Sequence, residues 1–336
     1  MKFSDIIGQQ ELKAHLQGAV KRSSPRQAYI FEGEKYSGKK MLAGVFAAAL
    51  QCEKGGIEPC GECHYCKMAQ SGSHPDIIRV NHERPNEIVV DEIREQLVED
   101  VSLRPYYGPY KIYIIDEADR MNMAAQNAVL KTLEDPPEYI VILLLAERIQ
   151  AFLPTILSRC MKLSVTPLSD EQIKNYLMRS HRLPEYEAAM ITAFAAGNLG
   201  KADRLASDEE FGGMRSSVAE LLSHIDEQPA DWLMDKAEQI VSEYKGRESE
   251  LFDFFVIWYR DVLLYKALND KERLIWQEES YTISREAAGM SYKRLLICFE
   301  DISSARKQLA ARVTAPRVMQ QLLIRLSGYA DHGEYK

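Results

Sequence analysis

The stretch Gly33–Lys40 has the residue spacing of a phosphate-binding loop. In that motif two glycines let backbone N–H groups surround phosphate oxygens, the following Lys reaches the outer phosphates, and a Ser or Thr hydroxyl holds Mg²⁺. Gly33, Gly38 and Lys39 stand at their motif positions, but Lys40 replaces the hydroxyl residue. An ammonium group cannot coordinate Mg²⁺ and repels it, so we expect a nucleotide site that hydrolyses poorly or not at all.

The acidic pair Asp116 and Glu117 is a second set of candidate residues. It ends the apolar run 111–115, which is typical of a buried parallel strand, and open α/β sheets place ligands at the carboxyl ends of their strands. There Asp116 would bind Mg²⁺ through water, and Glu117 would polarise the attacking water. Alternatively, the pair only caps the helix that follows; the loop upstream favours the nucleotide site.

The segment 52–66 holds four of the six cysteines of the chain, Cys52, Cys60, Cys63 and Cys66. Four thiolates suit tetrahedral Zn²⁺, and they leave no open position for catalysis, so we predict a structural zinc site. A redox Cys-x-x-Cys pair and disulfides are the alternatives, and disulfides are disfavoured in a cytosolic protein. His64 could compete as a ligand, but we expect it to stay outside the site.

Arg159 is the remaining candidate for chemistry. It stands just before the run 161–165, which reads as a strand. An Arg at such a position can simply pair with a carboxylate, or it can project outward as an arginine finger toward a phosphate bound by a neighbouring subunit. Spacing alone does not choose between these two roles.

The elements around these residues predict an α/β domain followed by helices. A strand at 27–31 precedes the loop, a helix at 41–50 follows it, and further strands are expected at 77–80 and 139–145. Residues 88–90 read as extended, with Asp91 as a helix N-cap. Residues 166–169 resemble a hinge, residues 208–214 with their two glycines resemble a linker, and the chain beyond reads as helix throughout.

Composition limits the classes of function. The chain has 336 residues and a formal net charge of −8, which argues against a free-standing nucleic-acid binder. No apolar run approaches the roughly 20 residues of a membrane span, and the start of the sequence has no apolar signal segment. We therefore expect a cytoplasmic protein with no membrane contact.

Taken together, the loop, the cysteine segment, the strand ending in Asp-Glu-Ala-Asp and Ser158-Arg159-Cys160 resemble the bacterial clamp loader of DNA polymerase III, an AAA+ family, and in particular its delta-prime type of subunit. The resemblance covers about residues 1–206. The stretches that carry it most specifically are Phe3–Gln9, Cys60–Cys66, Gln126–Pro137 and Thr155–Cys160.

This resemblance implies an α/β AAA+ P-loop domain with a parallel sheet, then a small helical lid domain and an all-α C-terminal collar domain. The expected bounds are 1–165 for the core with its zinc module at 52–66, 166–207 for the lid, and 208–336 for the collar. It also implies partners: gamma/tau and delta subunits, the sliding clamp, and primer–template DNA within the assembly. In the family, the Ser-Arg-Cys arginine enters the ATP site of the adjacent motor subunit, a role that Arg159 would inherit.

Three departures from the motor subunits of that family concern the nucleotide site. Lys40 replaces Ser or Thr, the segment Leu144–Glu147 lacks the small polar residue of the motors, and Gly200 stands where they carry an Arg. We therefore expect a subunit without intrinsic ATPase activity, acting as part of the DNA polymerase III holoenzyme, in which ATP and Mg²⁺ binding by this chain is doubtful. The alternatives are a catalytically active gamma/tau-type ATPase and a chain that binds nucleic acid alone through its zinc module.

Overall fold

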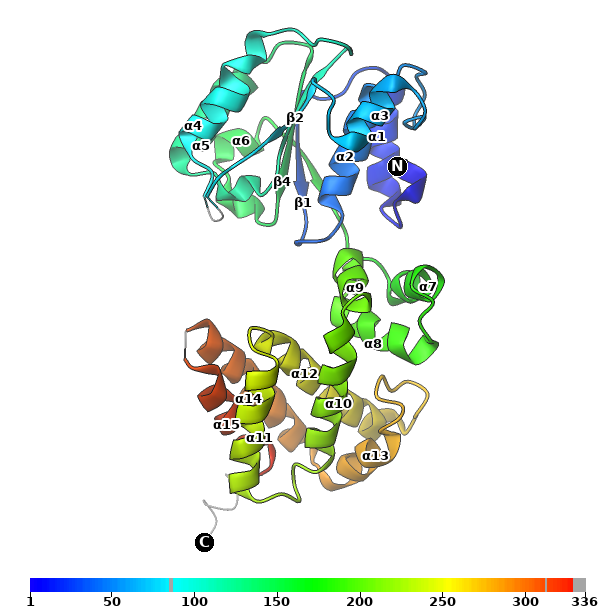
Figure 1. Ribbon diagram of the computed structural model, residues 1–336, viewed down its shortest axis with the longest axis vertical. Helices are drawn as coiled ribbons and strands as arrows, with labels where there is room; N and C mark the ends of the chain where they lie inside the picture. Colours follow the sequence, from blue (N-terminus) through cyan, green and yellow to red (C-terminus); the bar gives the residue numbers. More distant parts are fainter. Residues whose placement is uncertain (85–86, 312, 329–336) are drawn as a thin grey trace. The chain divides into compact units, whose positions relative to one another are not determined.

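The computed structural model describes residues 1–84, 87–311 and 313–328 (Figure 1). These residues form two compact units. The first comprises residues 1–173 and 197–201, and the second comprises residues 174–196 together with those from 202 onward. The division into three domains at 165 and 207 stays a prediction, and the end of the expected collar, 329–336, lies outside the described residues.

The first unit is built on a five-stranded parallel sheet, as predicted. The strand order is β2-β3-β4-β1-β5, and every neighbouring pair is parallel. The central strand β4 is buried along its whole length, which explains its continuous apolar sequence. The strands are β1 (Ala28–Glu32), β2 (Ile77–Val80), β3 (Lys111–Ile115), β4 (Ile140–Ala146) and β5 (Met161–Ser164).

Helices cover both faces of this sheet and bury one apolar cluster on each (Figure 1). One face packs against α1 (Gln10–Lys21) and α2 (Lys39–Leu50), with α3 (His64–Ser71) beside α2. The other face packs against α4 (Val90–Ile93), α5 (Met123–Glu134) and α6 (Pro154–Leu157). This two-layered cover confirms the α/β class.

The segment before α4 differs from the prediction. Ile88 makes only a single parallel bridge, to Met121, so residues 88–90 form no strand. The N-cap of α4 is Val89 rather than Asp91, because the Glu92 carboxylate reaches back and accepts the Val89 N–H at 2.9 Å. The prediction of Asp91 as the N-cap is therefore wrong by two residues.

All regular structure described beyond residue 165 is helical. Two glycines expected to lie in a linker, Gly212 and Gly213, instead lie inside α10, so that prediction is wrong. Each costs a helix about 1 kcal/mol relative to Ala, and burial of Phe211 and Met214 beside them offsets that cost. The helices are α7 (Asp170–Ser180), α8 (Glu185–Ala195), α9 (Leu199–Ala206), α10 (Glu209–Ser223), α11 (Ala230–Glu243), α12 (Glu248–Leu268), α13 (Ser280–Gly289), α14 (Tyr292–Ala310) and α15 (Ala315–Leu326).

Among the described helices, none combines the length and the apolar composition that crossing a membrane requires.

Candidate functional site

The phosphate-type loop connects the carboxyl end of β1 to the first residue of α2. Gly38 has φ +94°, a backbone conformation that favours glycine, and it turns the chain into the helix. The Lys39 side chain folds back under the loop, where its Nζ donates to the Gly33 carbonyl and, at 2.7 Å, to the Glu34 carbonyl. Lys39 is buried, and this burial lowers its pKa, although carboxylates nearby, Glu147 first among them, oppose the shift.

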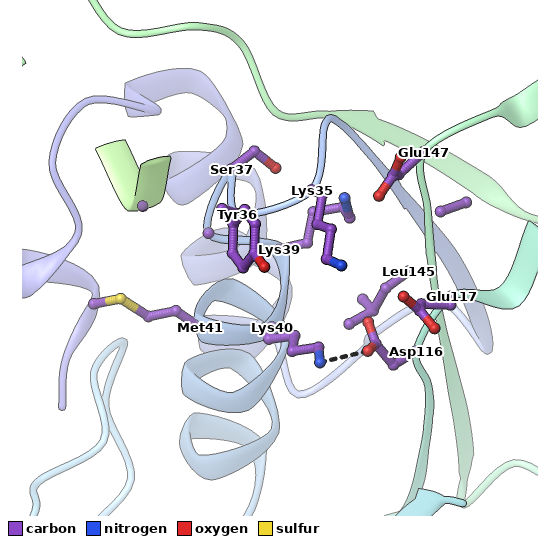
Figure 2. A pocket seen from close by; sticks show the side chains of 13 residues that line it. Lys35, Tyr36, Ser37, Lys39, Lys40, Met41, Asp116, Glu117, Leu145 and Glu147 are labelled. Carbon is purple, nitrogen blue, oxygen red and sulfur yellow. Dashed lines mark ion pairs between the residues drawn. The ribbon is translucent and has the colours of Figure 1, made fainter. Parts of the chain in front are cut away.

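A cavity of ≈ 320 Å³ lies at this loop and brings together residues from three strand ends (Figure 2). Gly38, Lys39, Lys40, Asp116 and Glu117 all line it, whereas Gly33 is not among the lining residues and meets the site through its carbonyl contact with Lys39. The structure thus places the predicted nucleotide-site residues side by side. Their role in nucleotide binding stays a prediction.

Lys40 makes the most informative contact in the cavity. Its Nζ lies 2.6 Å from Oδ2 of Asp116 (Figure 2). Asp116 is the carboxylate expected to bind Mg²⁺ through water, and the ammonium takes up that carboxylate oxygen and repels a metal ion beside it. The residues present therefore do not fit a divalent cation at this place.

Glu117 is also engaged by side chains of the same unit. Its backbone has φ +50°, and its Oε2 lies 2.7 Å from Nη1 of Arg120 and 3.6 Å from Nε2 of His82. The alternative role of the acidic pair, capping the next helix, does not hold for α5. There Asn122 is the N-cap, and its Oδ1 accepts the Ala125 N–H at 2.9 Å.

Residues 197–201, which belong to the first unit, pack directly on the loop. A Cβ added to Gly200 would lie 2.4 Å from the carbonyl oxygen of Tyr36, so this packing leaves no room for any side chain there. Asn198 fastens the same segment: it is buried, and its Nδ2 donates to the Lys35 carbonyl at 2.7 Å. The sequence analysis named Gly200 as a departure from the motor subunits, but it did not predict that Gly200 and Asn198 pack on the loop.

Glu147 lies at the far wall of the cavity, just after β4. Its N–H donates to Oδ1 of Asp119 at 3.3 Å, which fixes the backbone at the strand end. Leu145 and Ala146 line the same wall. A carboxylate among apolar side chains here can neither donate to a phosphate nor neutralise one.

Arg159 lies on the surface, at the other end of the sheet from the loop. Strand β5 is parallel to β1 with Met161 opposite Tyr29, so Arg159 precedes the amino end of β5 while the loop follows the carboxyl end of β1. Its Nη2 lies 3.3 Å from Oε1 of Glu134, and Nη1 donates to the Thr155 carbonyl at 3.1 Å. Both charged side chains are solvent-exposed, so the pair is weak. Arg159 cannot reach the loop of its own chain.

The four predicted cysteines converge at one point between α2 and α3. Their Sγ atoms all lie within 4.8 Å of one another, and Cys60 and Cys66 are separated by 3.9 Å. Metal–sulfur bonds of about 2.3 Å in a tetrahedron place sulfur atoms about 3.8 Å apart, so these thiols are placed to hold one metal ion. All four cysteines are free, which excludes disulfides among them. His64 is exposed and lies outside this group.

Backbone N–H groups point at these sulfur atoms. The Cys63 N–H donates to Cys60 Sγ at 3.3 Å, and the Cys66 N–H donates to Cys63 Sγ at 3.3 Å. The bonds from Cys63 and Glu62 lower the pKa of Cys60 to about 6. Such N–H···S bonds favour the thiolate, which is the form that binds metal.

Comparison with known proteins agrees with this geometry. Residues 8–169 match the family model described as DNA polymerase III, delta subunit. The chain is similar to subunits of the DNA polymerase III clamp loader. It is 29% identical to the DNA polymerase III subunit delta' of Bacillus subtilis, over 93% of this chain and 94% of that protein. It is 27% identical to the subunit tau of the same organism, over 96% of this chain but only 61% of that longer protein.

A solved structure of a DNA polymerase III gamma subunit-related protein from Thermotoga maritima is 20% identical, covers 94% of this chain and 98% of its own, and has a TM-score of 0.42. The predicted clamp-loader resemblance is confirmed. Both delta' and tau relatives extend over nearly the whole chain, so similarity alone does not separate a hydrolysing from a non-hydrolysing subunit.

Proposed function

We propose that this chain is a delta-prime subunit of a DNA polymerase III clamp loader, that it does not hydrolyse ATP, and that it supplies Arg159 to the ATP site of a neighbouring motor subunit. The observation that carries the proposal is the 2.6 Å contact between Lys40 and Asp116, because it puts an ammonium where hydrolysis requires Mg²⁺. The subunit acts in the cytoplasm with gamma/tau and delta subunits, and the assembly loads the sliding clamp onto primer–template DNA.

The position of Arg159 supports the role in trans. It is exposed and lies at the opposite sheet end from its own loop, and its contacts within the described part of the chain are with a surface carboxylate and a backbone carbonyl. A guanidinium held in this way can leave Glu134 for a phosphate of an adjacent subunit at little cost.

The decisive experiment is Arg159→Ala in a loader reconstituted with its motor subunits. An arginine finger contributes a factor of about 10³ to 10⁵ to the rate at the site that it enters. We expect DNA-stimulated ATP hydrolysis to fall sharply while the assembly stays intact by size-exclusion chromatography.

Arg94→Ala is the matched control, because Arg94 is also an exposed arginine paired with a nearby carboxylate, Asp91, in the same unit. It should leave turnover unchanged. Unchanged turnover in the Arg159→Ala loader would refute the role in trans.

A gamma/tau-type ATPase is the second candidate, favoured by one observation: Lys39, Asp116 and Glu117 still line one cavity. Turnover of ATP with Mg²⁺ by the isolated chain separates the two. We expect none above background, and robust turnover would favour the motor assignment.

We also propose that the metal held by the four cysteines is a structural zinc ion. Four thiolates are the ligand set that zinc prefers for this purpose, and they leave no position open to a substrate. Metal analysis of the purified chain should find about one zinc per chain, and Cys63→Ser should lower that content.

A further inference from the structure

A lysine of the chain itself places a cation at the candidate nucleotide site. Lys40 lies in the first turn of α2, and its ammonium contacts Asp116 at 2.6 Å while its side chain stays 71% exposed. An ammonium group has three N–H donors, and one contact with a carboxylate leaves others for a further acceptor. The cavity adjoins this group directly (Figure 2).

The loop keeps two other features that can bind a phosphate, a helix amino end and a lysine. The turn at Gly38 leads into α2, so the amino end of a twelve-residue helix faces the cavity. Lys39 uses two of its donors on the Gly33 and Glu34 carbonyls, which fixes its ammonium at the floor of the loop and leaves one donor.

Two acids of the cavity have cationic partners without a metal. Lys40 neutralises Asp116, the expected Mg²⁺ carboxylate, and Arg120 neutralises Glu117. Lys35 and Lys39 remain as cations on the lining, opposed by Glu147. A divalent cation would have to displace Lys40 or lie against it.

We propose that this loop binds the phosphate chain of a nucleoside di- or triphosphate without a divalent cation, with the Lys40 ammonium in the place of Mg²⁺. This goes beyond the proposed function, which requires only that the chain does not hydrolyse ATP. It gives the loop a ligand and inverts the usual metal dependence of such sites. Bound nucleotide then persists, since no metal activates its terminal phosphate.

The test is calorimetric titration of the full chain with ATP, ADP and tripolyphosphate, each in EDTA and in excess Mg²⁺. We expect ATP to bind in EDTA at least as tightly as in Mg²⁺, and tripolyphosphate to compete with it. Lys40→Met removes the charge and should weaken binding about tenfold or more under both conditions. Lys40→Thr restores the hydroxyl and should bind weakly in EDTA but recover in Mg²⁺.

Lys174→Thr is the matched control, because Lys174 forms an equivalent 2.8 Å pair with Glu185 in the second unit. It should leave both affinities unchanged. The proposal is overturned if the unmodified chain binds ATP only with Mg²⁺, or if it binds none at millimolar concentration in either buffer. Neither outcome touches the role of Arg159, which the reconstituted loader tests separately.

Discussion

At the scale of single residues, adjacent lysines in the loop have opposite environments. Lys39 is buried under backbone carbonyls, whereas Lys40 is exposed and paired with a carboxylate from another strand. Sequence predicted that Lys40 would hinder Mg²⁺, but the partner was not predictable, because it depends on how β3 aligns with the start of α2. The same holds for Gly200, whose contact with Tyr36 joins residues far apart in sequence.

Glu286 in α13 is a second residue whose environment the sequence did not indicate. Its carboxyl is buried, and Trp258 Nε1 donates to its Oε2 at 3.0 Å. Burial raises the pKa of Glu286 to about 7, the negative charge of Asp226 adds to the rise, and the Trp258 bond and the charge of Arg285 oppose it.

The folded state therefore holds a proton on Glu286 that the unfolded state releases at lower pH. The contribution of Glu286 to the free energy of unfolding is fully present below its unfolded pKa of 4.5. It is lost as the pH rises to about 7, and its size is up to about 3 kcal/mol. Glu286→Gln should remove this pH dependence.

Denaturant unfolding followed by tryptophan fluorescence measures the effect on Glu286, because all three tryptophans of the chain lie in the second unit. A stability that rises between pH 4.5 and 7 in the unmodified chain, or an unchanged profile in the Gln variant, would contradict it.

At the scale of elements, two glycines in helices have opposite surroundings. Gly200 in α9 leaves no space for a Cβ beside the Tyr36 carbonyl, whereas a Cβ on Gly212 in α10 would meet nothing within 4 Å. We expect Gly200→Ala to destabilise the first unit by about 1–3 kcal/mol through overpacking. Gly212→Ala should stabilise the second unit by about 0.5–1 kcal/mol, since Ala favours the helix.

Two spectroscopic probes distinguish the effects of these two glycine substitutions. Far-UV circular dichroism follows both units, while tryptophan fluorescence follows the second unit alone. Gly200→Ala should lower the midpoint of an unfolding transition that only circular dichroism detects. Gly212→Ala should raise the midpoint of the transition that fluorescence detects. A fluorescence shift in Gly200→Ala without any other change would argue against the packing explanation.

Most elements of the first unit could be predicted because each carries a local signal. The apolar runs of β3 and β4, the Gly-rich turn into α2 and the cysteine spacing are all read from a few consecutive residues. The failures lie where distant contacts overrule local preference: burial of Phe211 and Met214 keeps α10 helical through two glycines, and Glu92 moves the start of α4. The position of Arg159 relative to the loop needed the strand order, which no local pattern contains.

At the scale of the whole molecule, charge predicts how the isolated chain meets DNA. A net charge of −8 gives no favourable electrostatic term with a phosphate backbone. We expect the isolated subunit to bind primer–template DNA more weakly than about 10⁻⁴ M at physiological salt, as measured by fluorescence anisotropy. Submicromolar affinity with a steep salt dependence would instead favour autonomous binding through the cysteine module.

The parallel sheet has one further consequence, which concerns symmetry. The loop follows the carboxyl end of β1, and Arg159 precedes the amino end of the neighbouring β5, so the proposed arginine finger and the proposed nucleotide site lie at opposite ends of one sheet. Two copies related by a two-fold axis present identical surfaces to each other, which cannot join opposite poles. Under the role in trans that we propose for Arg159, the chain makes head-to-tail contacts with its neighbours, which generate rings or open rows with a direction. In such a row, we propose that a subunit whose own site does not hydrolyse ATP is the end member, because it supplies an arginine finger and needs none.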